Sequence, residues 1–215
     1  AQVLAHARAI KPDLILIPGD LTNLSTVDHP DCAAAAVAFL RELAALAPVF
    51  VSRGTPEVDD PEWVRSICKT AGVTLLDGST TDFPPADSSG NGPAFTLIGV
   101  ASAGPIDPHR EQLKELMTGV RLPSILLYHT PDIIETAAAC GVRLQVSGHT
   151  HGGQIRLPLI GPLFTASRYG RRFAAGRFQV GPTTLVVSRG VGMEGAGAPR
   201  LRFFCPPEVV VLSIK

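Results

Sequence analysis

The sequence has few cysteines and no excess of charge of either sign. Its four cysteines are widely spaced and include no CxxC pair, which argues against a disulfide framework or a zinc knuckle. We interpret them as small buried side chains of a protein from a reducing compartment: Cys32, Cys68, Cys140 and Cys205. Lys+Arg and Asp+Glu number 19 each, so the chain lacks a strong basic field and we expect no nucleic-acid partner.

Long hydrophobic runs are also missing. No uncharged apolar run approaches the ~18 residues that span a bilayer, and the longest, residues 32–40, ends at Arg41. There is no signal peptide, but the sequence begins at Ala1 rather than Met and almost inside a helical pattern. We therefore expect a natural segment upstream. The localisation stays open: cytoplasmic, or membrane-associated if that segment is an anchor, which would also allow membrane contact.

The residues that are present suit a globular protein. Hydrophobic residues make up 45% of the chain and charged residues 18%. A chain of 215 residues is long enough to bury about 70% of its extended surface. We predict one domain over residues 1–215.

Short apolar segments alternate with helical patterns as far as residue 150. Strands are predicted over residues 14–17, 49–52, 73–76, 95–100, 124–128 and 142–146. Helices are predicted over residues 2–10, from Asp28 or His29 to about 46, from a cap at Asp60 to Gly72, over 107–118, and from Thr130 to Gly141. This alternation predicts an α/β sheet core.

The remaining segments are less regular. Residues 77–93 are rich in Ser, Asp, Pro and Gly and predict a loop or a wide hairpin. Residues 157–178 form a Gly/Pro/Arg-rich excursion. Residues 183–188 and 209–214 have strand patterns, so the C-terminal part is expected to be rich in β structure.

Four of the predicted strands end in glycine or in polar residues: Gly19-Asp20, Gly54, His129, and His149 with His151. In an open α/β sheet, ligands bind at the carboxyl ends of the strands. One carboxylate and three imidazoles form a mixed oxygen and nitrogen set that suits a hard-to-borderline divalent ion. Taken singly, Asp20 could be a turn residue and His129 a buried histidine bonded to backbone; together they favour a metal site.

The stretch VSGHTHGGQI, residues 146–155, carries the strongest part of this signal. On an extended backbone, His149 and His151 at i and i+2 project to the same side and reach one small volume. Glycines on both sides of the pair permit tight turns and a close approach of backbone to a ligand. The alternative is two loop histidines with local hydrogen bonds; the full pattern favours metal binding.

Five segments together resemble the calcineurin-like metallophosphoesterases, in the branch whose core ends in GHTHGGQ. They are PDLILIPGDLTN at residues 12–23, LLYHTPD at 126–132, VSGHTHGGQIRLP at 146–158, VVSRGVG at 186–192 and PPEVVVL at 206–212. The resemblance runs through almost the whole chain. It implies a four-layer αββα sandwich, here without its first strand, which would lie before Ala1.

The resemblance also implies a dinuclear metal site that uses Mn, Fe or Zn ions. Asp20 would bridge two metals, His129 and His149 would bind the second, and His151 the first. Gly152, Gly153 and Arg156 would lie on the substrate side. Such sites activate a water for attack on phosphorus and stabilise charge on the phosphoryl oxygens.

The chain departs from the family pattern at two places. The family's opening Asp-x-His pair is absent, and His6 does not replace it because Leu4 stands two residues before. The Gly-Asn-His-Asp/Glu motif is Gly54-Thr55-Pro56-Glu57, so a hydroxyl replaces the amide ligand and proline replaces the proton-donating histidine. We expect a weakened or mononuclear site, with Thr55, Glu57, Asp59 or Asp60 as candidate substitute oxygens.

After the glycine pair, arginines follow at 156, 168, 171, 172 and 177. A solvated surface is the favoured interpretation, with phosphate binding as the alternative. The apolar residues 157–164 either pack in the core or in a hairpin, which is favoured, or cover the site or touch lipid.

The sequence therefore predicts a metal-dependent hydrolase of phosphate mono- or diesters. Its partner would be a phosphorylated small molecule or a phospholipid-like ester. The alternative is a catalytically impaired relative that binds metal or a phosphorylated ligand without turnover, which Thr55 and Pro56 favour.

Overall fold

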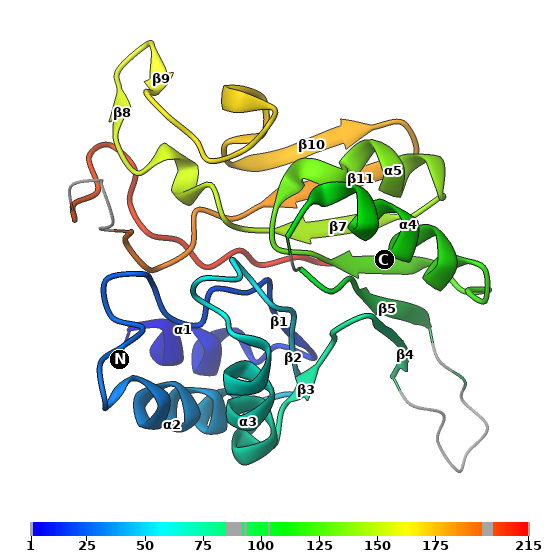
Figure 1. Ribbon diagram of the computed structural model, residues 1–215, viewed down its shortest axis with the longest axis horizontal. Coiled ribbons are helices and arrows are strands. Elements are labelled where there is room, and N and C mark those ends of the chain that lie inside the picture. The colour runs from blue at the N-terminus through cyan, green and yellow to red at the C-terminus, as the bar shows by residue number, and fades with distance from the viewer. Residues whose placement is uncertain (1, 85–91, 93, 103, 195–199, 215) are drawn as a thin grey trace.

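The computed structural model describes residues 2–84, 92, 94–102, 104–194 and 200–214. Two sheets form its centre, with helices on their outer sides (Figure 1). The smaller sheet is parallel and has the order β1-β2-β3: Ile15–Ile17, Val49–Val51 and Thr74–Leu75. Three helices alternate with these strands in the chain: α1 Gln2–Ile10, α2 Cys32–Ala44 and α3 Pro61–Ala71.

The larger sheet has six strands in the order β10-β11-β7-β6-β5-β4. They are β4 Ser79–Phe83, β5 Phe95–Gly99, β6 Ser124–Leu127, β7 Leu144–Ser147, β10 Gly176–Val180 and β11 Thr183–Val187. The four central strands are parallel, and the two edge strands pair antiparallel with their neighbours. Its helices are α4 Ile106–Met117, the short helix η1 Pro131–Ile133 and α5 Ile134–Ala139.

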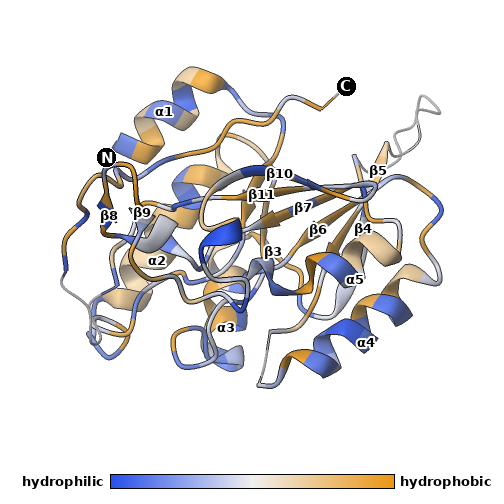
Figure 2. Cartoon of the chain, turned by 90° about the horizontal axis from the view of Figure 1, so that it is seen from above, coloured by the Kyte–Doolittle hydropathy of each residue, from blue (hydrophilic) through white to orange (hydrophobic). Residues whose placement is uncertain are grey.

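Three buried clusters establish the layers. Between the two sheets, Phe50 of β2 and Leu76, which follows β3, pack against the larger sheet. Their partners there are Leu97, Ile125 and Leu127. A second cluster joins α1, α2 and α3 to the smaller sheet, and a third joins α4 and α5 to the larger one. Figure 2 shows hydrophobic colour along the strands and hydrophilic colour on the outside of α4. The layers are therefore helix, sheet, sheet and helix, and the predicted α/β sandwich is confirmed.

Local sequence signals account for several element ends. The Asp60 carboxylate accepts the backbone N–H groups of Glu62 and Trp63 at 3.0 and 2.9 Å and begins α3, as predicted. Gly72 ends that helix with φ at +75°, a conformation that glycine adopts without steric cost. The wide-hairpin alternative for residues 77–93 is correct, because β4 pairs antiparallel with β5. Residues 85–91 and 93 lie outside the described residues.

Three predictions about elements are wrong. Residues 209–214 form no strand, and no described strand pairs with them. Their five large apolar side chains, all but Ser213, are therefore 40–61% exposed. The helix expected from Asp28 or His29 begins at Cys32, because the backbone N–H groups of Val27 and His29 bond back to Asn23 and Thr26 in a turn. The excursion ends earlier than predicted, since β10 already begins at Gly176.

The excursion contains a small hairpin and two short helices. Its elements are η2 His151–Gly153, β8 Arg156–Leu157, β9 Gly161–Pro162 and η3 Gly170–Phe173. Cys68 and Cys205 are buried, and Cys32 and Cys140 are half-buried. Within the described residues, no helix is both long and apolar enough to cross a bilayer.

Candidate metal centre

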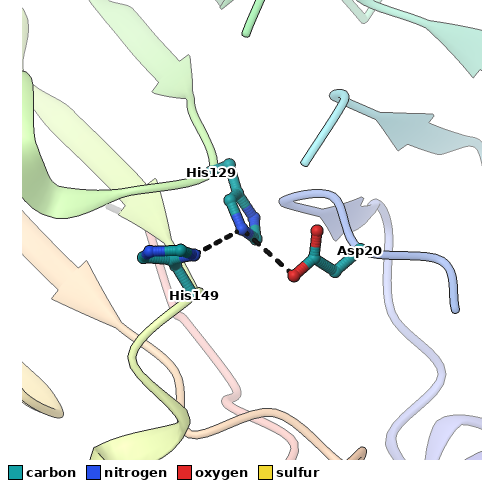
Figure 3. Close-up of side chains that lie close together, drawn as sticks. All are labelled: Asp20, His129 and His149. Atoms are coloured by element: carbon teal, nitrogen blue, oxygen red, sulfur yellow. Dashed lines mark hydrogen bonds and ion pairs between the residues drawn. The ribbon is translucent and has the colours of Figure 1, made fainter. Parts of the chain in front are cut away.

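Strand ends from both sheets bring three predicted ligands together. Asp20 follows β1, His129 follows β6 and His149 follows β7, and their side chains point toward one another (Figure 3). The backbone turns sharply at two of them, because Asp20 and His149 have φ values of +51° and +66°. Non-glycine residues rarely adopt these angles, and such strain is concentrated at functional sites.

The atoms of this group lie within reach of one ion. One ligand atom from each of Asp20, His129 and His149 lies within 4.8 Å of the others. His129 is central: its Nε2 lies 3.2 Å from Asp20 Oδ2 and 2.9 Å from His149 Nδ1. A carboxylate oxygen and two imidazole nitrogens fit a borderline divalent ion such as Zn, Fe or Mn.

Backbone carbonyls orient both imidazoles. His129 Nδ1 lies 2.7 Å from Pro18 O, and His149 Nε2 lies 2.9 Å from Ala166 O. A carbonyl only accepts, so each of these ring nitrogens must carry the proton. The other nitrogen of each ring, His129 Nε2 and His149 Nδ1, faces the shared volume. A proton on His129 Nε2 serves its contacts with Asp20 and His149, and loss of that proton leaves both nitrogens with lone pairs for an ion, which is the usual arrangement around histidine metal ligands.

Thr55 completes this group from the loop after β2. Its hydroxyl lies 3.3 Å from both Asp20 Oδ2 and His129 Nε2, and its N–H donates to Asp20 Oδ1 at 2.7 Å. The other substitute oxygens named from the sequence are placed differently: Glu57 is exposed and Asp60 caps α3. Thr55 is thus the residue of that loop whose oxygen faces the predicted ligands.

Asp59 lies beneath the site and joins its loops. It is fully buried, and its carboxylate accepts the N–H groups of Asp20, Leu21 and Gly54 at 2.8, 3.1 and 2.7 Å. The loops it joins are in close contact, because a Cβ on Gly54 would lie 2.1 Å from Asp20 Oδ1. Asp59 therefore fixes the backbone that carries Asp20 and Thr55, instead of offering a free ligand oxygen.

The pKa values follow from this packing. Burial raises the pKa of Asp20, but the hydrogen bond and charge of His129 outweigh it and hold that pKa below its usual range. Burial lowers the pKa of His129, yet Asp20 raises it overall. Burial and the charge of His129 lower the pKa of His149. Burial, followed by the charge of Asp20, raises the pKa of Asp59 to about 6.

His151 lies near this group but outside it. It lines the same pocket, of about 240 Å³, as Asp20, His129 and His149. Its Nδ1 lies 3.2 Å from Gln154 Oε1, and burial lowers its pKa. His151 therefore presents Nε2, and not Nδ1, as its unbonded ring nitrogen toward other groups.

The residues expected on the substrate side do not line this pocket. A Cβ on Gly152 would lie 2.6 Å from Arg189 Cγ, and one on Gly153 would lie 2.3 Å from Pro162 Cβ. Arg156 donates to the carbonyl of Gly152 at 3.0 Å. These three residues pack the loop behind the histidines. Apolar side chains line the pocket beside the ligands instead: Leu21, Phe39, Leu40, Val191 and Met193.

Sequence reasoning missed the residues that support His151. Arg202 donates to the carbonyls of His151, Arg189 and Gly192 at 3.1, 2.7 and 2.6 Å. Gln154 accepts from the N–H of Glu194 at 2.8 Å. Gln154 lies within the histidine motif, so its position in the sequence could have indicated its role. No local sequence pattern distinguishes Arg202.

Comparison with known proteins identifies relatives of this chain, although no family model matches it. The chain is 33% identical over 213 residues to the uncharacterized metallophosphoesterase YkuE of Bacillus subtilis, covering 95% of this chain and 68% of that protein. It is 31% identical over 210 residues to the phosphodiesterase YaeI of Escherichia coli, covering 95% and 71%. A shorter match, 35% over 100 residues, covers 42% of this chain and 29% of the UDP-2,3-diacylglucosamine pyrophosphatase LpxG of Chlamydia muridarum.

The first two matches extend over nearly the whole chain and over two thirds or more of each relative. They agree with the αββα layers and with a carboxylate and two histidines gathered at the strand ends. The chain belongs to the metallophosphoesterase family.

Proposed function

We propose that this chain hydrolyses phosphate esters with a divalent metal held by Asp20, His129 and His149. The observation that carries the proposal is the convergence of their ligand atoms within 4.8 Å. A bound metal would supply Lewis-acid activation of water and neutralise charge on the phosphoryl oxygens. The names of the relatives, which include a phosphodiesterase and a pyrophosphatase, support the same reaction class.

The chain's own residues prepare the site for a cation. The lowered pKa of Asp20 keeps its carboxylate ionised at neutral pH. The Pro18 and Ala166 carbonyls orient the rings of His129 and His149, so both rings can bind a cation without rearrangement once it displaces the proton on His129 Nε2. Thr55 supplies a further neutral oxygen at 3.3 Å from Asp20 and His129.

We propose a phosphodiester, or a phospholipid-like ester, as the substrate. The pocket joins the charged ligand group to apolar side chains, including Phe39, Leu40 and Met193. An apolar wall beside a phosphate-binding centre suits an ester with a hydrophobic group. The relative LpxG is named for a diacylated glucosamine nucleotide, which has this combination of parts.

His151 is proposed as a ligand for a second ion. It lines the pocket with the other three, but it stands outside the group whose atoms lie within 4.8 Å of one another. This favours one tightly held ion and a second, weaker position. A second candidate function is binding without turnover. Pro56 favours it, because proline cannot transfer a proton to a leaving group.

The test is manganese-dependent hydrolysis of p-nitrophenyl phosphate and bis(p-nitrophenyl) phosphate by the full chain, with metal content measured on the same samples. His149→Ala is the control. We expect turnover of the diester above this control and about one tightly bound ion per chain. Metal bound without turnover would favour the binding function, and neither metal nor turnover would contradict both.

A further inference from the structure

The β8–β9 hairpin presents apolar side chains to solvent. Leu159 at its tip is 107% exposed, Ile160 57%, Leu163 50% and Phe164 74%. The hairpin projects away from both sheets (Figure 1). Contiguous exposed apolar side chains of this size mark a surface that binds something.

Neither turn chemistry nor packing explains these residues. Leu159 has φ at +66°, a conformation in which turns favour glycine, asparagine or aspartate. A polar residue would therefore suit the turn better, and a leucine here contributes no buried contact. Pro162, by contrast, is buried against Gly153, so the base of the hairpin is packed and only its tip is not.

The charge around the hairpin has one sign. Residues 136–193 contain seven arginines but no Asp, Glu or Lys. The other 12 basic residues and all 19 acidic residues lie outside this stretch, so the rest of the chain carries a net charge of −7. The neutral total thus hides a strongly basic segment.

Four arginines of this segment are exposed and near the hairpin in sequence: Arg168, Arg171, Arg172 and Arg177. Among the described residues, none of them forms an ion pair with a carboxylate. Arg171 Nη1 lies 3.5 Å from the Ile160 carbonyl, which places a guanidinium directly at the hairpin tip. Arg171 and the apolar tip therefore occupy one surface.

We propose that the β8–β9 hairpin docks this protein on an anionic lipid bilayer. Leu159, Ile160 and Phe164 would enter the headgroup region, and the neighbouring arginines would bind lipid phosphates. Apolar side chains with adjacent arginines are the composition of interfacial membrane-binding segments. Guanidinium groups also pair bidentately with phosphate oxygens.

A lipid surface fits these residues better than a second copy of the chain or a protein partner does. In a two-fold dimer the hairpin surfaces would face each other, and their unpaired arginines would repel. A stable protein interface also buries more than about 1,000 Å², which exceeds what a hairpin tip offers. A bilayer requires only a protruding apolar tip and nearby cations.

Docking through this hairpin would hold the metal centre at the membrane. Ala166, four residues after the hairpin strand β9, accepts from His149 at 2.9 Å, and β9 itself packs on Gly153. A phospholipid-like substrate would then reach the pocket without leaving the bilayer surface. This consequence rests on the proposed function, but the docking itself does not require turnover.

The test is co-sedimentation of the full chain with vesicles of phosphatidylcholine alone or mixed with phosphatidylglycerol. The key variant is Leu159→Asn, because asparagine tolerates the left-handed backbone and the fold is expected to keep or gain stability. We expect binding to the anionic vesicles to fall about tenfold in this variant, from the loss of one inserted leucine. Val211→Ser, a 61% exposed apolar residue far along the chain, is the matched control.

A charge pair of variants tests the second half of the proposal. Substituting both Arg171 and Arg172 by glutamine is expected to weaken binding about tenfold or more at low salt and less at high salt. Arg143→Gln is the control, because Arg143 is exposed at the opposite end of β7 from the histidines.

Clear outcomes would overturn the proposal. They are no preference of the full chain for anionic vesicles, or equal losses in Leu159→Asn and Val211→Ser. Self-association that Leu159→Asn abolishes, without vesicle binding, would assign the tip to a second copy instead. His149→Ala is expected to keep vesicle binding, so a failure of hydrolysis and a failure of docking are distinguishable.

Discussion

The strand-end loops and the β8–β9 hairpin treat polar and apolar groups in opposite ways, and it is the loops that line the pocket. In the loops after β1, β2, β6 and β7, the side chains of Asp20, Thr55, His129 and His149 are buried or half-buried, and each has hydrogen-bond partners within the chain. Asp59, for example, accepts three backbone N–H groups with no exposure to solvent. In the β8–β9 hairpin, Leu159 and Phe164 are exposed and nearby arginines have no carboxylate among the described residues.

The difference shows which part of the molecule has its interaction partners within the chain. The proposed ligand side chains have hydrogen-bond partners within the chain, so their geometry is set before any ligand arrives, as electrostatic preorganisation requires. In the hairpin, apolar side chains are exposed and nearby arginines have no carboxylate partner among the described residues. Burial of these groups would therefore stabilise a complex with a ligand or surface, and not the fold. Substitutions in the loops are therefore expected to change stability and chemistry, and substitutions in the hairpin to change binding alone.

The largest effect is expected from His129→Ala. This ring lies 2.9 Å from His149 and 3.2 Å from Asp20, so its removal takes away the side chain that contacts both of the other ligands. We expect hydrolysis of bis(p-nitrophenyl) phosphate to fall on the order of 10³-fold, with bound metal lost in parallel. Metal content and initial rates on the same sample provide the measurement.

His109→Ala is the matched control for this prediction. His109 is also a buried histidine, with Nδ1 at 2.7 Å from Tyr128 Oη, but it lies outside the metal centre. We expect it to lower stability and to leave metal content unchanged. Equal metal loss in both variants would show that any buried histidine matters only for folding.

Asp59→Ala is expected to have the next largest effect. It leaves one buried and two part-buried backbone N–H groups without their acceptor, and we expect about 3 kcal/mol of lost stability in urea unfolding. Asp60→Ala, the adjacent carboxylate, removes only a helix cap and should cost about 1 kcal/mol. A cost for Asp59 no greater than that for Asp60 would contradict its role as the link between the loops.

The sequence pattern predicted the ligand residues of the site better than it predicted the residues that hold their loops in place. Asp20, His129 and His149 each follow an apolar strand, and parallel strands bring their carboxyl ends together, so local pattern was enough. The α3 cap at Asp60 was equally local. Asp59 was different: it was named as a substitute ligand oxygen, but its partners are 5, 38 and 39 residues away, a distance at which no sequence pattern operates.

The wrong strand at residues 209–214 has a related cause. Its apolar residues match a strand pattern, but a strand forms only where a partner offers a free ladder edge. A hydrophobic pattern shows that a segment can form a strand, but the strand forms only if a neighbouring strand accepts its hydrogen bonds. The same limit applies to residues 157–164: their apolar character was visible, but their exposure depended on what the hairpin failed to contact, which is a property of the fold.

Thr55→Val tests how much of the centre rests on the loop after β2. Valine keeps the volume of threonine but removes the hydroxyl that lies 3.3 Å from Asp20 and His129. We expect about a tenfold weaker metal affinity with little change in fold. Thr55→Asn should strengthen binding, because an amide oxygen is a better neutral ligand. Unchanged affinity in both variants would place Thr55 outside the ligand group.

Glu208→Gln, which probes the pocket wall at Arg189, should have the smallest effect. The Glu208 carboxylate accepts three hydrogen bonds from Arg189, whose loop lines the pocket. The backbone N–H and Nε donate at 2.8 Å and Nη2 donates at 2.5 Å. Burial raises the pKa of Glu208, but these hydrogen bonds outweigh it and lower that pKa below its usual range.

A depressed carboxylate pKa stabilises the fold above the unfolded value and loses that contribution as pH falls through the folded value. We therefore expect the unfolding free energy of the natural chain to drop by about 1 kcal/mol more than that of Glu208→Gln between pH 6 and pH 3. Urea titrations with EDTA present would measure it, since metal release then adds no pH dependence. Glu62→Gln, in an exposed ion pair with Arg65, should show no such difference. If both variants lose the same amount, the rim ion pair contributes no more than a solvated surface pair, and the pocket wall at Arg189 is held by Arg202 instead.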